Sequence, residues 1–382
     1  MKYAIHAARF LLEQEEAGPG YLIVEDGRFG EITAEAPPEM DIIDYSDYTI
    51  APGLFDTHIH GIGGYDIMDG TVEAVQEISK ALLPLGVTRF LPTTLTSSPA
   101  DLEQAIVSIR KAVETGLSGA QSAGIFLEGP YFTEEHKGAQ NPAYFRDPDV
   151  AEFHKWQELA DGTIVKIAIA PERNQAAAFT KEMSKEVLVS LGHTNATFDC
   201  CQELVDAGAR EYVHLFNGMR GLHHREPGVV GAALTDSRAY AEMICDGHHV
   251  HPQVATHAYA TKQDKLVLIT DCMRAGNMPD GNYMLGEFPV VMQDGIARTE
   301  AGSLAGSTLL LKNGVKNLQA WSGSPLYDVW HRASLSPAAS LGLEEQFGSI
   351  ASGKTADFVA MDDSFNVHAT AIAGEIRFES KK

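Results

Sequence analysis

Leu54-Phe-Asp-Thr-His-Ile-His60 has the pattern of a short buried strand that ends in two histidines. Residues two apart on a strand point to the same side, so the imidazoles of His58 and His60 are expected to face the same way. The pattern therefore predicts a strand whose carboxyl end carries a pair of side chains able to bind a metal.

Seven further apolar runs follow the same plan, and helix-like stretches separate most of them. The eight predicted strands are Leu54–His60, Val87–Pro92, Gly124–Glu128, Ile164–Ala170, Val187–His193, Glu211–His214, Ala241–Asp246 and Leu266–Asp271. The predicted helices include Val72–Leu85, Asp101–Glu114, Ala151–Leu159, Asp199–Ala207 and Pro252–Thr261. Strands that alternate with helices are typical of parallel sheets, and eight such units predict an α/β protein with a (β/α)8 TIM-type barrel. An open doubly wound sheet is the alternative, but no Gly-x-Gly-x-x-Gly follows a strand.

Both ends of the chain are rich in strand patterns. An Asp26-Gly27 turn separates two apolar runs near the N-terminus, and a turn after Gly348 leads into further strand-like segments near the C-terminus. We therefore expect residues 1–50 plus 349–382 to form one small sheet domain, and residues 51–348 to form the barrel.

Composition and charge exclude several classes of protein. A net charge of −23 over 382 residues argues against a nucleic-acid partner or an anionic membrane surface, since either would repel the chain. The four cysteines match neither a zinc ribbon nor a redox pair. No signal-peptide core and no apolar span of about 20 residues is found, so we expect a cytoplasmic protein.

Side chains able to bind a metal recur at the ends of the predicted strands: Glu128 ends the third, His193 the fifth, His214 the sixth and Asp271 the eighth. Taken singly, such a Glu is often a turn residue and such a His a hydrogen-bonded core residue. In a barrel, however, these strand ends meet at one mouth, where active sites lie. Two histidines facing a carboxylate fit a catalytic divalent metal, and an acid such as Asp271 can accept and return a proton.

Several blocks of sequence make the pattern more specific. They are Leu127-Glu-Gly-Pro-Tyr131, Lys137-Gly-Ala-Gln-Asn-Pro142, Leu191-Gly-His-Thr-Asn-Ala196, His214-Leu-Phe-Asn-Gly-Met219, Arg225-Glu-Pro-Gly228, Asp246-Gly-His-His-Val250 and Leu304-Ala-Gly-Ser307. Through them the chain resembles the amidohydrolase superfamily and, more narrowly, the family of N-acetylglucosamine-6-phosphate and N-acetylgalactosamine-6-phosphate deacetylases. The resemblance spans nearly the whole chain. It implies a barrel with a small β-sandwich built from both termini, often as a homodimer, that hydrolyses an N-acetylhexosamine 6-phosphate to acetate and the amino-sugar 6-phosphate.

The resemblance also implies roles for individual residues. Glu128, His193 and His214 would bind the main metal, with Asp271 as the catalytic acid and base. His58 and His60 match the members that hold a second metal, whereas other members lack both histidines and use one ion. One or two divalent ions per chain are therefore expected. Zinc is the first candidate, and iron, cobalt and manganese also suit such ligands.

An anionic substrate of an acidic protein needs local donors for its phosphate, and the loop after the sixth predicted strand contains them. Arg225 can clamp two phosphate oxygens, Asn217 and Gly218 can add neutral donors, and His224 is a weaker candidate. The alternative for Arg225 is an ordinary surface ion pair.

Two further residues are candidates for contact with the sugar. His249 could touch a sugar hydroxyl or polarise the acetyl oxygen, although a structural role is the alternative. Gln140 stands where some relatives carry a substrate-contacting histidine, and it can donate a hydrogen bond but carries no charge. The extra histidines around His224 and His249 resemble the galactosamine branch somewhat more, which leaves the sugar epimer open.

Two other functions compete with deacetylation. One is a cyclic-amide hydrolase or deaminase of the same superfamily, in which a carbamylated lysine on the fourth strand often bridges two metals. Lys166 lies on that predicted strand but well before the mouth. The other is a barrel without catalysis that serves as a scaffold, which would be expected to have lost metal ligands.

Overall fold

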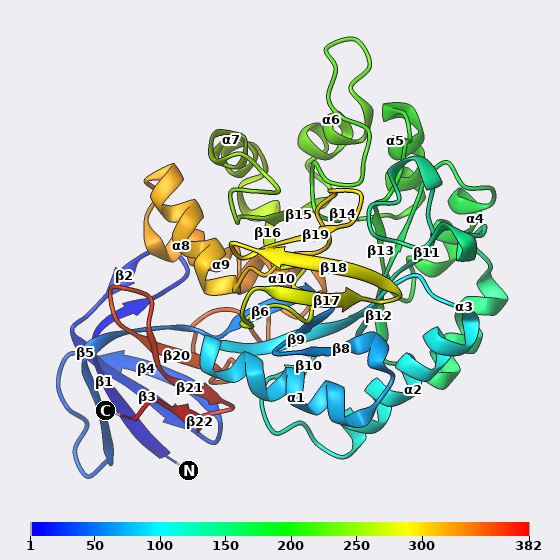
Figure 1. Ribbon diagram of the computed structural model, residues 1–382. Coiled ribbons are helices and arrows are strands. Elements are labelled where there is room, and N and C mark those ends of the chain that lie inside the picture. Colours follow the sequence, from blue (N-terminus) through cyan, green and yellow to red (C-terminus); the bar gives the residue numbers. More distant parts are fainter. Residues whose placement is uncertain (1, 382) are drawn as a thin grey trace.

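The computed structural model describes residues 2–381, and its centre is a ring of eight parallel strands (Figure 1). They are β6 (Leu54–Ile59), β9 (Val87–Thr94), β11 (Ile125–Tyr131), β12 (Ile164–Ile169), β13 (Leu188–Leu191), β14 (Glu211–Tyr212), β15 (Tyr240–Ile244) and β16 (Leu266–Ile269). The gap between β16 and β6 is bridged just after β16, where Asp271 N donates to His58 O at 2.9 Å and Ile59 pairs with Cys272. The predicted (β/α)8 barrel is confirmed.

Helices cover most of the outside of this ring (Figure 1). They are α1 (Val72–Leu82), α2 (Pro99–Glu114), α3 (Val150–Leu159), α4 (Ala176–Met183), α5 (Phe198–Ala207), α6 (Gly228–Thr235), α7 (Pro252–Lys262), α8 (Leu311–Ser322), α9 (Leu326–His331) and α10 (Leu335–Ser340). Side-chain oxygens of Thr71, Ser98, Asp149 and Thr197 cap the first turns of α1, α2, α3 and α5. None of the helices in residues 2–381 combines the length and the apolarity needed to cross a membrane.

Strands from both ends of the chain share one eight-stranded sheet beside the barrel (Figure 1). It contains β1 (Lys2–Leu11), β2 (Glu16–Ala17), β3 (Gly20–Glu25), β4 (Arg28–Thr33), β5 (Ile42–Pro52), β20 (Phe358–Met361), β21 (Val367–Ile372) and β22 (Glu375–Glu379). The ends join where β5 pairs antiparallel with β20, and the sheet has a hydrophobic core of its own. The predicted domain of both termini is confirmed, while its bounds, 1–50 plus 349–382 against 51–348, stay a prediction.

A small antiparallel sheet that the sequence patterns did not predict follows the last barrel strand. It consists of β17 (Gly281–Leu285), β18 (Phe288–Gln293) and β19 (Ile296–Thr299), joined by tight turns. Its buried side chains pack on Leu95 and Met273. The shorter strands β7 (Gly61–Ile62), β8 (Tyr65–Asp66) and β10 (Gln121–Ser122) lie around the barrel. The insertion matters for function because Leu285, at the end of β17, lines the cavity at the barrel mouth.

Candidate active site and metal centre

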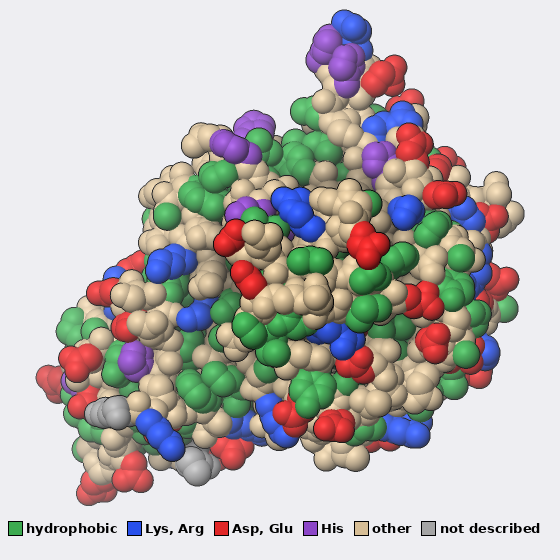
Figure 2. Space-filling view, viewed as in Figure 1, with side chains coloured by type: hydrophobic (Ala, Val, Ile, Leu, Met, Phe, Trp, Pro, Cys, Tyr) green, Lys and Arg blue, Asp and Glu red, His purple; other side chains and the backbone are tan. Residues whose placement is uncertain are grey.

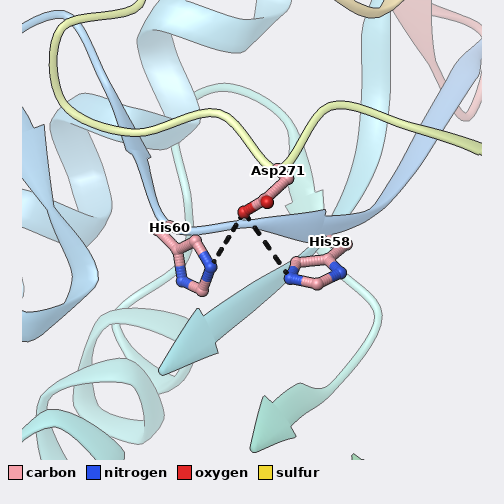
Figure 3. A group of neighbouring side chains, drawn as sticks. All are labelled: His58, His60 and Asp271. Atoms are coloured by element: carbon pink, nitrogen blue, oxygen red, sulfur yellow. Dashed lines mark ion pairs between the residues drawn. The ribbon is translucent and has the colours of Figure 1, made fainter. Parts of the chain in front are cut away.

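Six polar side chains meet at the carboxyl-terminal mouth of the barrel, as the strand ends predicted. They form two groups, in each of which the potential ligand atoms lie within 4.8 Å of one another. The groups are His58, His60 and Asp271, shown in Figure 3, and Glu128, His193 and His214. In Figure 3 both imidazoles point toward the Asp271 carboxylate, which lies 3.1 Å from His60 Nε2 and 3.8 Å from His58 Nε2.

Glu128 lies between the two groups and touches both. Its Oε1 is 3.2 Å from His193 Nε2 and 3.1 Å from His214 Nε2. On the other side, Oε1 lies 3.4 Å from His58 Nε2 and Oε2 lies 3.2 Å from His60 Nε2. A carboxylate whose two oxygens together contact both groups could bridge two cations.

Each of the four imidazoles is held at Nδ1 by an acceptor behind it. His60 Nδ1 lies 3.1 Å from Thr93 O, His193 Nδ1 3.0 Å from His136 O, and His214 Nδ1 3.0 Å from Asn217 O. His58 Nδ1 instead lies 2.8 Å from the carboxylate of Glu242. When Nδ1–H donates in this way, the lone pair of Nε2 faces the centre of the site, which is how metal-binding imidazoles are fixed.

Three of these residues adopt a backbone conformation that residues other than glycine rarely occupy. The φ angles are +45° at His193, +29° at His214 and +50° at Asp271. Each lies two residues beyond the end of its strand, where the chain must turn while the side chain still points inward. Such strain costs on the order of 1–3 kcal/mol per residue and persists where the surroundings enforce it, often at active sites.

The charges of the site favour a bound cation. Burial lowers the pKa of His60, but hydrogen bonds with Asp271 and Glu128 outweigh it and raise that pKa to about 10. For Asp271, burial raises the pKa, but the hydrogen bond from His60 and the nearby imidazoles lower it overall. Carboxylates that stabilise protons on their neighbours in this way also stabilise a divalent cation in place of those protons.

The residues present fit one or two divalent metal ions. Nε2 of the fully buried His58 has no hydrogen-bond partner among residues 2–381, yet it faces the oxygens of Glu128 and Asp271. A buried nitrogen in that state is costly unless something binds it. Imidazole and carboxylate ligands on three sides, with a cavity on the remaining side, suit a catalytic metal with an open position.

A cavity of about 140 Å³ opens on these ligands. Four of the predicted substrate-binding residues line it: Gln140, Asn217, Gly218 and His249. Its walls also include residues that the sequence analysis did not assign, namely Leu95, Gly138, Ala139, Leu285, Leu304 and Gly306. The side chains of Leu95, Leu285 and Leu304 form an apolar surface suited to a small methyl group. Gln140, Asn217 and His249 instead suit hydroxyl groups.

Gln140 and His249 are both fixed by neighbours. The Gln140 amide donates to Glu128 Oε2 at 2.7 Å and accepts from Thr96 N at 2.8 Å, so it orients the central carboxylate. Nδ1 of His249 lies 2.6 Å from Asp246 Oδ2. Burial raises the pKa of Asp246, but the hydrogen bond with His249 outweighs it and lowers that pKa.

The structure does not bring Arg225 and His224 into the cavity. Both are exposed on the loop before α6, which projects from the body of the molecule in Figure 1. Lys, Arg and His side chains gather at the tip of this projection in Figure 2. Within residues 2–381 Arg225 forms no ion pair with a carboxylate, and its guanidinium donates to His224 Nε2 at 2.7 Å.

Two charged residues that lie beneath the site, Lys166 and Glu242, were not among the predicted site residues. Lys166 does not reach the mouth; its Nζ contacts the carboxylates of Glu211 and Glu242 inside the barrel. Glu242, which holds His58, lies in the middle of β15, whose sequence is Tyr-Ala-Glu-Met-Ile. A charged residue inside an otherwise apolar, buried strand is the signal that could have identified both.

The fold and the paired ligand groups are those of a metal-dependent hydrolase barrel, and the chain belongs to the amidohydrolase family, which matches residues 49–377. Its relatives within that family are deacetylases of amino-sugar phosphates. The chain is 42% identical over 358 residues to an N-acetylglucosamine-6-phosphate deacetylase of Vibrio furnissii, covering 93% of this chain and 90% of the relative. It is 38% identical over 377 residues to an N-acetylgalactosamine-6-phosphate deacetylase of Escherichia coli O157:H7, covering 98% and 99%.

Solved structures agree with this assignment. A mutant of the N-acetyl-D-glucosamine-6-phosphate deacetylase from Mycobacterium smegmatis, in complex with N-acetyl-D-glucosamine 6-phosphate, superposes with a TM-score of 0.93 and 34% identity. The match covers 98% of this chain and 99% of that one. The N-acetylglucosamine-6-phosphate deacetylase from Pasteurella multocida superposes with a TM-score of 0.94 over the full length of both chains, at 29% identity.

Proposed function

We propose that this chain hydrolyses the acetamido group of an N-acetylhexosamine 6-phosphate, giving acetate and the amino-sugar 6-phosphate. The observation that carries the proposal is the pair of ligand groups that share Glu128, with Asp271 beside them at the edge of a small cavity. Both sugar epimers remain substrates to test, because the relatives named above include a deacetylase for each.

In this proposal Glu128, His193 and His214 hold one divalent cation, and His58 and His60 hold a second, with Glu128 between them. Zinc is our first choice, since three nitrogen and oxygen ligands with an open position are typical of catalytic zinc. Bound there, a divalent cation supplies Lewis-acid polarisation of the acetyl carbonyl and makes water a nucleophile near neutral pH.

The side chains of this protein then transfer the protons and orient the substrate. Asp271, ionised because its pKa is lowered, accepts a proton from the attacking water as the new C–O bond forms. It returns this proton to the sugar nitrogen as the C–N bond breaks, because an unprotonated amine leaves poorly. His249, whose Nδ1 is held by Asp246, lines the cavity and directs its Nε2 toward the acetyl oxygen.

The substrate phosphate needs positive charge from beyond the cavity. In the described part of the chain the lining contains Asn217 and the backbone of Gly218 but no Lys or Arg. Arg225, which lies beside His224 and has no carboxylate partner within residues 2–381, is therefore the cation that we propose for the phosphate. We further propose a cytoplasmic homodimer; the four cysteines, which are all free, fit a reducing compartment.

The reaction is tested by incubating the zinc-loaded protein with each epimeric N-acetylhexosamine 6-phosphate and measuring acetate and free amino groups. Equal amounts of acetate and amine are expected, without ammonia. Release of ammonia without acetate would favour the deaminase alternative instead.

Asp271→Asn tests the proton transfer. We expect kcat to fall by about 10²- to 10⁴-fold, the usual contribution of a general acid–base group, while substrate still binds in calorimetry. Asp264→Asn is the matched control, because that exposed acid precedes the same strand at the opposite end of the barrel and should leave kcat unchanged. Equal turnover by both variants contradicts the role of Asp271. A wild type that binds the substrate without turning it over would indicate a scaffold protein without catalysis.

A further inference from the structure

A buried group of charges lies inside the barrel beneath the ligand groups, and the mechanism above does not use it. Lys166 on β12, Glu211 on β14 and Glu242 on β15 are all fully buried or nearly so. The Lys166 ammonium contacts a carboxylate oxygen of each acid. Three charges withdrawn from water inside the barrel are expensive to bury, and a hydrophobic core could replace them at no loss of stability.

Glu242 differs from Glu211 because the oxygen that faces away from Lys166, Oε2, contacts two of the proposed metal ligands. Glu242 Oε2 accepts a hydrogen bond from the backbone N–H of His214 at 3.2 Å and lies 2.8 Å from His58 Nδ1. One carboxylate therefore contacts a ligand residue of each group. Among residues 2–381 Glu211 accepts only from Ser190 Oγ, at 3.2 Å, besides its contact with Lys166, and it touches no proposed ligand.

The contact with His58 determines which nitrogen of that ring faces the site. With the Nδ1 proton donated to Glu242, the lone pair of Nε2 points toward Glu128 and Asp271. The ring has little freedom otherwise, since Phe126 packs edge-on against it with centroids 4.9 Å apart. His58 is the only one of the four imidazoles in the described site whose Nδ1 is held by a carboxylate rather than by a backbone carbonyl. An ionised acceptor makes the imidazole a stronger metal ligand.

We propose that Glu242 is a positioning residue that sets the occupancy of the second cation by orienting His58, while Lys166 pairs with Glu242 inside the barrel. This inference rests on the proposed function for the assignment of His58 as a ligand. Glu242 also accepts a hydrogen bond from the backbone N–H of His214. One side chain therefore contacts a proposed ligand of each cation.

The test compares Glu242→Gln with Glu211→Gln in the zinc-loaded protein, because both variants remove one charge next to Lys166 but only the first alters the contact with His58. Bound zinc per chain is measured by elemental analysis after gel filtration, and the affinity of each ion by competition with a chelator. We expect two ions in the wild type and in Glu211→Gln. Glu242→Gln should bind the weaker ion about 10- to 100-fold less tightly and retain about one ion per chain.

Equal zinc content in Glu242→Gln and Glu211→Gln overturns the inference, and so does a wild type that holds a single ion. If Glu242→Gln does not fold, Glu242→Asp serves instead, because it keeps a negative charge near Lys166 but withdraws the carboxylate from His58 by one methylene. It should also lose the weaker ion. Zinc content is independent of turnover, so a wild type that releases no acetate while Glu242→Gln loses an ion refutes the proposed function and leaves this inference standing.

Discussion

Gln140 shows how one neutral side chain supports the centre of the site. Its amide group is buried and joins Glu128 Oε2 to the backbone N–H of Thr96. Gln140→Ala leaves that N–H without an acceptor inside the protein, which costs about 1–3 kcal/mol. We expect a free energy of unfolding lower by this amount in denaturant titration, together with weaker retention of metal.

The neighbouring Asn141 provides the matched control for this prediction. Its amide donates to Glu287 at 2.7 Å and its Oδ1 accepts from Ala143 N at 3.1 Å, both in an exposed setting, so Asn141→Ala should lower stability by only about 0.5 kcal/mol. Equal losses in the two variants would show that Gln140 has no special role in the cluster.

At the scale of elements, the strands and their order were predictable because their residues carry two signals at once. Most barrel strands are buried and largely apolar, and five of the eight carry a residue of the two groups within the strand or within two residues of its end, as with Asp271 after β16. The sheet β17–β19 was missed, since it belongs to no repeating unit and its alternating pattern is short. The left-handed turns at His193 and His214 were also out of reach, because tertiary contacts impose them on residues that do not favour them.

Helix α9 carries a titratable group that links stability to pH. His331, its last residue, is 2% exposed, and neither ring nitrogen has a hydrogen-bond partner among residues 2–381. Burial, reinforced by the charge of Arg332, lowers the pKa of His331 from 6.5 to about 4. As the pH falls through 6.5, His331 becomes protonated in the unfolded chain but stays neutral in the native protein. Stability is therefore lost between pH 6.5 and pH 4, by about 3 kcal/mol in all.

His331→Gln tests this dependence, since glutamine is polar but does not titrate. We expect the free energy of unfolding of the wild type to fall by about 3 kcal/mol more than that of His331→Gln between pH 7 and pH 4. Both proteins are compared free of metal, so that loss of metal in acid does not contribute. Parallel pH profiles would mean that His331 is accessible to protons in the native state.

Across the whole molecule, the proposed cations would join distant parts of the barrel. The six residues of the two groups come from β6, β11 and the ends of β13, β14 and β16. They hold the carboxylates of Glu128 and Asp271 close together, and a cation between them offsets their mutual repulsion. A cation present at 1,000 times its dissociation constant stabilises the native state by about 4 kcal/mol. For a chain of 382 residues this corresponds to a melting temperature higher by about 5 °C, if barrel and terminal sheet unfold together.

Removal of the metal should therefore lower the melting temperature by about 5 °C, and adding zinc back should restore it. Calorimetry before and after treatment with a chelator measures the change, with the chelator already saturated by calcium as the control for its other effects. Because the ligands span the ring while the terminal sheet has a core of its own, the loss should appear in the barrel transition if the two parts unfold separately. A melting temperature that stays the same after elemental analysis has verified complete loss of metal would show that the six side chains are stable together without a cation. Their mutual hydrogen bonds, such as those around Glu128, would then be sufficient to hold the mouth of the barrel in place.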